Sequence, residues 1–283
     1  RLSADNSDVS IDDISKLEKK SQDWLEERYS KLTTWEKTQV ARHPNRPHFI
    51  NYAEGMLDMF IILSGDRLFG DDKAIIGGLG KINNQSVMFI GHEKGNDTKT
   101  RIKHNFGMAH PEGYRKSIRL MRLAEQFRIP VITFIDTPGA YPGVGAEERG
   151  QSEAIAKSTD CTLSLKVPVI SIIIGEGGSG GAIALAAANK VFMLEHSIYT
   201  VASPEASASI LWRSSDKAKE AAESMKITST DLMDLGIIDS IIDEPLGGAH
   251  REPVQMISQV KTHLRDTLTA VSYTHLTLPT THC

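Results

Sequence analysis

Residues 175–182 read Gly175-Glu176-Gly177-Gly178-Ser179-Gly180-Gly181-Ala182 and lie between two apolar stretches. The preceding stretch, residues 167–174, is rich in β-branched side chains and predicts a buried strand. The following stretch, residues 182–188, consists of small apolar residues and predicts a packed helix. Glycines let the backbone approach a ligand closely, and the unpaired N–H groups at the start of a helix attract negative charge. The sequence therefore predicts a strand–loop–helix unit whose loop is a candidate binding site.

The alternation of strand and helix extends in both directions from this unit. We expect strands at residues 74–82, 86–92, 129–135, 167–174, 191–194 and 237–242, and helices at residues 11–42, 51–63, 111–127, 147–157, 182–188, 207–212, 216–225, 229–235 and 253–268. Asn83-Asn84 is a good turn pair between the first two strands. Several strands are continuously apolar, which is typical of a parallel sheet covered by helices. The predicted fold class is α/β.

Composition excludes several classes of protein. The 283 residues carry a formal net charge of -4, without the basic footprint that nucleic-acid binders usually show, so we expect no DNA partner. The longest apolar runs are far shorter than a membrane span, and the polar start of the chain does not resemble a signal peptide, so we expect no membrane association. Cys161 and Cys283 are too few for a zinc site built from cysteine, and they favour a reducing, cytoplasmic location.

Three ligand-binding interpretations of the glycine run compete. A phosphate-binding P-loop fails, because Gly181-Ala182 stand where a lysine followed by serine or threonine is needed. A dinucleotide fingerprint remains open, since Gly175, Gly177 and Gly180 fit its spacing and Glu195 follows about 20 residues on. An oxyanion hole also remains open, in which backbone N–H groups hold an oxygen that becomes negative in a transition state. A simpler alternative is tight packing between helix and strand, which also requires small residues.

A second glycine-rich segment covers residues 136–150, directly after the strand predicted at residues 129–135. Its glycines, Gly139, Gly143 and Gly145, alternate with the stiffening Pro138 and Pro142. Ligands of open α/β sheets sit outside the carboxyl ends of the strands, so both glycine-rich loops are expected at one edge. Each could donate one N–H to the same oxygen, which is the arrangement needed to stabilise an enolate without a serine or cysteine nucleophile.

The acidic residues of this second segment have simpler interpretations than catalysis. Asp136 is interpreted as a turn or cap residue rather than a base. Glu147 and Glu148 fall in the first turn of the predicted helix, where acidic side chains are favoured in any protein.

Longer words in the sequence carry a family resemblance. They are Ala41-Arg42-His43-Pro44 with Arg46-Pro47, Gly65-Asp66-Arg67, Asp71-Asp72-Lys73-Ala74-Ile75, Ile90-Gly91-His92, Asn105-Phe106-Gly107-Met108, Pro111-Glu112-Gly113-Tyr114-Arg115-Lys116, the segment from Phe134-Ile135-Asp136 through Gln151-Ser152-Glu153-Ala154-Ile155, the glycine run itself, Ser203-Pro204-Glu205 with Ser209-Ile210-Leu211-Trp212, and Glu244-Pro245-Leu246-Gly247-Gly248-Ala249-His250-Arg251. On these words the chain resembles the alpha subunits of multisubunit acetyl-CoA carboxylase carboxyltransferases, from about Leu17 to about Leu268.

The resemblance implies a crotonase-like fold of repeated ββα units with paired oxyanion holes. We expect an N-terminal helical extension at residues 1–65 and the crotonase-like carboxyltransferase domain at residues 66–271. Residues 272–283 are rich in threonine, carry no charge apart from histidine and show no helical period, so we interpret them as a non-native tail.

The resemblance also implies a function. Such a subunit helps to transfer the carboxyl group of carboxybiotin, carried by the biotin carboxyl carrier protein, to acetyl-CoA, giving malonyl-CoA for fatty acid biosynthesis. The alpha chain would bind carboxybiotin as donor substrate and no covalent cofactor. A beta chain would carry the CoA side and the zinc, and two chains of each kind would form a heterotetramer within an ATP-dependent complex that includes biotin carboxylase. The chain would then be active only with the beta subunit.

The expected site consists of backbone groups. The resemblance points to Gly180 and Gly181 as one oxyanion donor region, and to Gly143 and Val144 as the other. The substrate-binding residues would be Gly177, Gly178, Ala140 and Tyr141, and no metal site is expected in this chain.

The alternatives are of different classes. One is another crotonase-fold enzyme acting on a different acyl-CoA, and another is a dinucleotide-binding oxidoreductase. A catalytically silent scaffold is the third.

Overall fold

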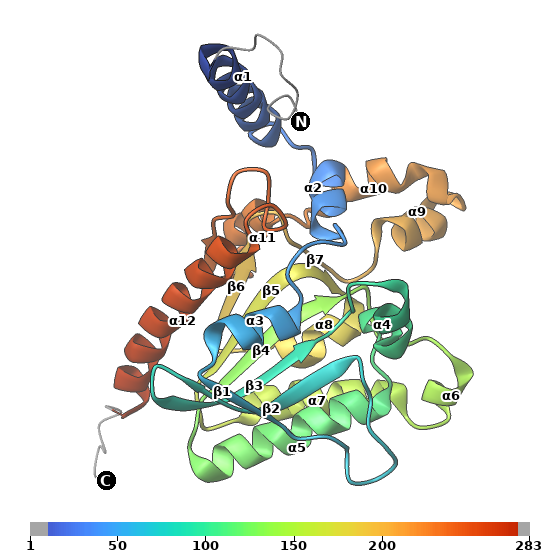
Figure 1. Cartoon of the computed structure of the whole chain (residues 1–283). Helices are drawn as coiled ribbons and strands as arrows, with labels where there is room; N and C mark the ends of the chain where they lie inside the picture. The colour runs from blue at the N-terminus through green and yellow to red at the C-terminus, as the bar shows by residue number, and fades with distance from the viewer. Residues whose placement is uncertain (1–10, 277–283) are drawn as a thin grey trace.

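A computed structural model describes residues 11–276, and an eight-stranded sheet forms its centre (Figure 1). The strands are β1 (Met59–Ile62), β2 (Ile75–Ile82), β3 (Gln85–His92), β4 (Val131–Thr137), β5 (Val169–Gly178), β6 (Lys190–Leu194), β7 (Ile198–Thr200) and β8 (Ser240–Ile242). Their order across the sheet is β1-β2-β3-β4-β5-β6-β8, with β7 paired to the end of β5. The first two pairings are antiparallel and the remainder parallel, so the prediction of a largely parallel sheet is confirmed.

Helices cover both faces of the sheet, as Figure 1 shows. On one face lie α5 (Pro111–Phe127), α7 (Gln151–Ser164) and α8 (Ser179–Ala186), whose buried residues share a core cluster with the sheet. On the other lie α3 (Phe49–Met56) and α12 (Pro253–Leu276). Every residue of β4 and β5 is buried, because helices pack on both sides of them.

The remaining elements lie outside these layers. They are α1 (Ile11–Tyr29), α2 (Thr34–Ala41), α4 (Thr98–Lys103), the 3₁₀ turn η1 (Asn105–Gly107), α6 (Val144–Glu147), α9 (Pro204–Trp212), η2 (Ser215–Lys217), α10 (Ala218–Met225) and α11 (Ser229–Asp234). None of the helices within residues 11–276 combines the length and the apolar character needed to cross a membrane.

Two of the helices predicted near the N-terminus are partly wrong. Residues 11–42 form two helices rather than one, because Thr33 caps the second: its hydroxyl accepts the N–H of Glu36, whose carboxylate binds the Thr33 N–H in return. In the stretch predicted as a helix at residues 51–63, the second half is strand β1, which pairs with β2 at the edge of the sheet. A short apolar run fits either element, and the partner strand decides.

Other elements also differ from the prediction, and β7 and α4 were not predicted. Residues 147–157 are divided between α6 and α7, and β5 continues through Gly178 into the expected glycine turn. Helix α12 extends to Leu276, so the expected lack of helix is wrong for residues 272–276. The rest of the predicted tail lies outside the described residues.

Candidate active site

The carboxyl ends of β4 and β5 are joined by Asp136. One carboxylate oxygen of Asp136 accepts the N–H of Glu176 at 3.0 Å and lies 2.6 Å from Lys94 Nζ; the other lies 3.4 Å from His48 Nδ1. Gly175 makes room for this carboxylate, since a Cβ there would lie 2.5 Å from Asp136 Oδ1. The two strand ends that carry the glycine-rich loops are therefore held at a fixed separation.

Asp136 is an anchor rather than a proton acceptor. Burial alone would raise the pKa of Asp136, but the Lys94 ammonium and the hydrogen bond from His48 hold it well below the usual range. A carboxylate that stays ionised and saturated with donors has little tendency to take a proton from substrate. The structure extends the prediction of a turn or cap residue, because the cap joins two neighbouring strands.

Glu176 ties the same edge to the N-terminal helices. Its carboxylate lies 2.6 Å from Arg42, directly after α2, and Arg42 also binds Glu205 of α9 at 2.6 Å. Burial would lower the pKa of Arg42, but the two carboxylates raise it, so the guanidinium of this half-buried network stays charged. The carboxylate of Glu176 thus serves to connect the end of β5 to the N-terminal helices.

Helix α8 starts directly at the end of β5. Ser179 has a left-handed φ of 56°, which turns the chain sharply from strand into helix. No side chain of the described residues caps this N-terminus, and unpaired N–H groups at a helix start are the kind of donor that holds an anion. The sequence placed the start of this helix at Ala182, three residues too late.

The two loops touch at this helix start. A Cβ on Gly178 would lie 2.3 Å from the carbonyl oxygen of Pro138. A Cβ on Gly181 would lie 2.7 Å from Ala140 N and 2.8 Å from Gly139 C. Only glycine permits such an approach, so the backbones of the two loops are in direct contact, as expected for adjacent strand ends.

The residues expected in the site occupy three positions around this contact. Gly177 and Gly178 are the last residues of β5, and Gly180 and Gly181 lie in the first turn of α8. Ala140 belongs to the loop segment that meets the helix, and Tyr141 follows it. Gly143 is the N-cap of α6, where it packs on Tyr141, and Val144 is 75% exposed. Residues 138–140, rather than Gly143 and Val144, therefore make the contact with α8.

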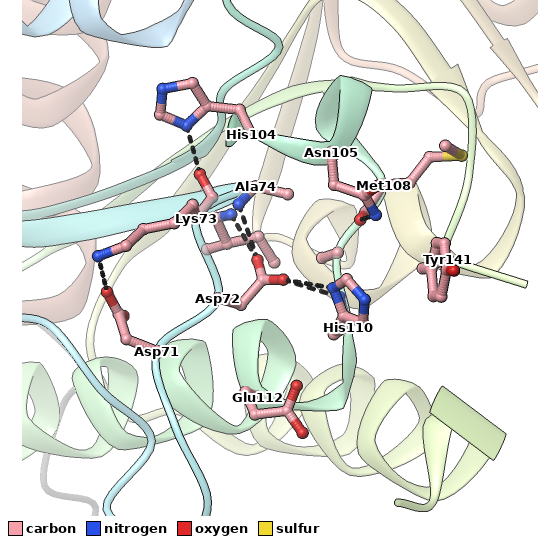
Figure 2. A network of polar contacts seen from close by, with 12 residues as sticks. Asp71, Asp72, Lys73, Ala74, His104, Asn105, Met108, His110, Glu112 and Tyr141 are labelled. Atoms are coloured by element: carbon pink, nitrogen blue, oxygen red, sulfur yellow. Dashed lines mark hydrogen bonds and ion pairs between the residues drawn. The ribbon is translucent and has the colours of Figure 1, made fainter. Parts of the chain in front are cut away.

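A polar network behind Tyr141 supports this loop, and the sequence did not reveal it (Figure 2). Tyr141 lies against the ring of His110, with centroids 4.4 Å apart, and its N–H donates to the carbonyl of Ala109. His110 donates through both its backbone N–H and Nδ1 to one oxygen of the buried Asp72. Asp72 belongs to one of the family words, but His110 lies between two of them and 38 residues away, so no local pattern connected the two.

Gln151 and Tyr114 complete the support of the two loops. The side-chain amide of Gln151 donates to the carbonyls of Ala109 and Tyr141, which fixes the loop to the start of α7. The hydroxyl of Tyr114 would lie 2.9 Å from a Cβ on Gly181, so this aromatic side chain packs beneath the contact. Burial raises the pKa of Tyr114 far above its usual value, and the hydroxyl stays neutral.

The structure argues against the dinucleotide alternative. Gly177 pairs with Thr137 of β4 and Tyr199 of β7, so it belongs to a strand rather than to a phosphate-binding turn. The carboxylate of Glu195 accepts the N–H of Glu244 at 3.1 Å, so it already has a hydrogen-bond partner within this chain. Within residues 11–276 there is also no cluster of three or more side chains of the types that hold a metal ion.

Comparison with known proteins decides the family. Residues 1–278 match the family described as "Acetyl co-enzyme A carboxylase carboxyltransferase-like". The chain belongs to this family. It is 62% identical over 259 residues to the acetyl-coenzyme A carboxylase carboxyl transferase subunit alpha of Parvibaculum lavamentivorans, which covers 91% of this chain and 81% of that protein. The subunit alpha of Agrobacterium fabrum is 62% identical over 254 residues, covering 89% and 80%.

Membership in the acetyl-CoA carboxylase carboxyltransferase family makes this chain an enzyme subunit of the transferase class. Solved structures agree on the fold. The transcarboxylase 12S core superposes with a TM-score of 0.60 at 17% identity, over 77% of this chain and 42% of that one. The beta subunit of geranyl-CoA carboxylase from P. aeruginosa gives 0.57 at 16%, over 81% and 44%. The chain spans less than half the length of these two proteins, and the predicted crotonase-like fold is confirmed.

Proposed function

We propose that this chain supplies the carboxybiotin half of a carboxyltransferase site. The supporting observation is the contact between the β4 and β5 loops at the uncapped start of α8, where Gly181 packs on Ala140. Backbone N–H groups gathered at a helix start suit an oxygen that gains negative charge. The ureido oxygen of biotin gains such charge when the carboxyl group leaves the adjacent nitrogen.

The transfer can then proceed without a side-chain base. Carbon dioxide leaves carboxybiotin as the N–C bond breaks, and the electron pair moves to the ureido oxygen. The resulting biotin anion takes a proton from the methyl group of acetyl-CoA. The enolate so formed attacks carbon dioxide, which gives biotin and malonyl-CoA. Asp136 does not compete for the proton, since its ion pair with Lys94 holds it ionised.

The contribution of this chain would be electrostatic preorganisation. We assign the donor groups to the first turn of α8, at Gly180 and Gly181, and to the loop around Gly143 and Val144, with Ala140 nearest to the helix. Losing one such donor typically lowers the rate by about a hundredfold. Gly177, Gly178 and Tyr141 would shape the space beside the donors.

The other half of the site would come from a beta subunit that holds acetyl-CoA and a zinc ion. We propose a cytoplasmic heterotetramer of two alpha and two beta chains, supplied with carboxybiotin by a carrier protein and an ATP-dependent biotin carboxylase, which serves fatty acid biosynthesis. Ile210, Leu211 and Trp212 are largely exposed on α9, and large exposed apolar side chains in a row are typical of a surface that a partner covers.

The reverse reaction tests this proposal. Malonyl-CoA and a free biotin derivative are incubated with this chain, with its beta subunit, and with both. The proposal predicts biotin-dependent formation of acetyl-CoA only when both chains are present. Activity of this chain alone, or activity that does not require biotin, would indicate a different crotonase-fold reaction.

A further inference from the structure

The turn between α4 and α5 holds an aromatic side chain in a strained conformation. Three successive residues have left-handed φ values: Asn105 at 46°, Phe106 at 54° and Gly107 at 79°. The conformation is natural for glycine but costs free energy for a phenylalanine. Asn105 stabilises the turn by donating from its side-chain amide to the carbonyl of Met108 at 2.7 Å (Figure 2). Strained residues of this kind persist only where the surrounding structure holds them, and they cluster at functional sites.

The turn lies beside the proposed carboxybiotin site. A Cβ on Gly107 would lie 3.0 Å from the carbonyl oxygen of Asp136 and 2.8 Å from Cγ of Lys94, so the turn packs on the end of β4. Its other side is fixed by His104, whose Nδ1 bonds the carbonyl of Lys73 at 2.7 Å. Phe106 is nevertheless 47% exposed. The strained turn therefore presents an aromatic ring to the outside, close to where the donor loops begin.

Helix α4, next to the turn, is basic. Lys99, Arg101 and Lys103 lie within six residues, and none of the three meets a carboxylate within residues 11–276. Asp97, whose carboxylate accepts the N–H of Thr100, precedes them and offsets one of the three cations, so residues 97–103 keep an excess of two positive charges (3 − 1 = 2). This local excess of positive charge contrasts with the net charge of -4 of the whole chain.

A cleft of about 360 Å³ continues this surface towards Tyr141. Its wall includes Lys103, Ile102 and His110, and Ile102 is 65% exposed. Two carboxylates in the same cleft form ion pairs, Asp71 with Lys73 and Lys116, and Glu112 with Arg115 and Arg149. The third, Asp72, accepts hydrogen bonds from His110. Lys103 in this cleft, and Lys99 and Arg101 on α4, are thus cations that meet no carboxylate within residues 11–276, and they lie beside the exposed Ile102.

We infer that α4 and the turn that follows it dock an acidic protein domain that carries the biotinyl group. We call this the α4 surface, defined by Lys99, Arg101, Ile102, Lys103 and Phe106. Exposed apolar side chains beside unpaired cations suit a protein partner of opposite charge, because the charges steer the encounter and the apolar side chains are buried on contact. The inference rests on the proposed function, since the α4 surface matters only if biotin reaches the neighbouring loops.

The test compares a carrier-bound donor with a free one in the assembled complex. The reverse reaction is run with malonyl-CoA and either the biotinylated carrier domain or free biotin. For Arg101→Glu/Lys103→Glu, the KM for the biotinylated carrier should rise about tenfold or more, because two attractive contacts become repulsive. The KM for free biotin and both kcat values should stay within about twofold. Lys157→Glu/Lys166→Glu, at two exposed lysines within α7 and beyond its end, is the control of equal charge.

Phe106→Gly separates docking from folding. Glycine accepts the left-handed φ, so the melting temperature should not fall, while the carrier KM should rise several-fold. An unchanged carrier KM in both variants would overturn the inference. An equal loss with free biotin would also overturn it, since the surface would then serve catalysis or subunit assembly. Absence of any biotin-dependent reaction in the unaltered complex is a different result, which refutes the proposed function itself.

Discussion

Replacing Gly181 by alanine should displace the loop that completes the site. The added Cβ would lie 2.7 Å from Ala140 N and 2.8 Å from Gly139 C, whereas ordinary contacts begin at 3.4 Å. The difference, 3.4 − 2.7 = 0.7 Å, must come from movement of backbone, because neither atom belongs to a flexible side chain. Overpacking of this kind costs about 1–3 kcal/mol, and a misplacement near 1 Å at reacting groups can cost about a hundredfold in rate.

Gly180→Ala is the matched comparison. Its Cβ would meet Cγ2 of Ile155 at 3.3 Å, and that side chain can move by the small amount required. Alanine also favours a helix by about 0.5–1 kcal/mol relative to glycine. The first turn of α8 should therefore keep its stability in this variant, although a methyl group now stands beside the proposed donor groups.

The assays are thermal unfolding of each variant and the reverse transfer reaction in the assembled complex. Gly181→Ala should lower the melting temperature by several degrees and the transfer rate by about a hundredfold. Gly180→Ala should leave the melting temperature unchanged or slightly higher. If Gly181→Ala has the melting temperature and the transfer rate of the unaltered chain, the close approach of the two loops is required neither for stability nor for transfer, which contradicts the prediction.

Three buried ionisable groups give further predictions. Asp136→Asn breaks the ion pair with Lys94 and should cost about 3 kcal/mol in urea unfolding; an unchanged stability would show that Asp136 does not anchor the strand ends. Burial lowers the pKa of His92 to about 4, so the unfolded state binds a proton below pH 6.5 that the folded state does not, and about 2 kcal/mol should be lost at pH 5. His92→Leu should remove that part of the pH dependence, and an identical slope would contradict the assignment. Glu244→Gln strands the buried Arg46 and should cost about 3–5 kcal/mol, most of which Arg46→Met/Glu244→Leu should restore if the cost arises from the unpaired charge.

The sequence predicted the elements that local pattern determines. The helix at residues 111–127 and the hairpin with Asn83-Asn84 at its turn were predicted correctly, because a proline start and a turn pair act within a few residues. Strand β1 was missed, since pairing with β2 rather than local periodicity selects it. The short α4 was not predicted at all. Its only local signal is the N-terminal cap, in which Asp97 accepts the N–H of Thr100 three residues on.

The sequence predicted the glycines of the site but not the side chains that support its loops. Glycine runs after two apolar strands indicated which loops meet, because neighbouring parallel strands end at one edge. The partners of Asp136 come from residues 48, 94 and 176, and no local pattern connects positions so far apart. For the same reason the sequence could not show that residues 138–140, rather than Gly143, contact α8.

The central claim is that the first turn of α8 binds the biotin donor. The most direct test measures binding of free biotin and of acetyl-CoA to the assembled complex, with and without Gly180→Ala. Isothermal titration measures both dissociation constants in the same preparation. We predict that Gly180→Ala weakens the binding of biotin about tenfold and leaves the binding of acetyl-CoA unchanged, because the donor groups at α8 would serve only the carboxybiotin half. A loss of acetyl-CoA binding with biotin unaffected would contradict it and would place the acyl-CoA at this helix instead.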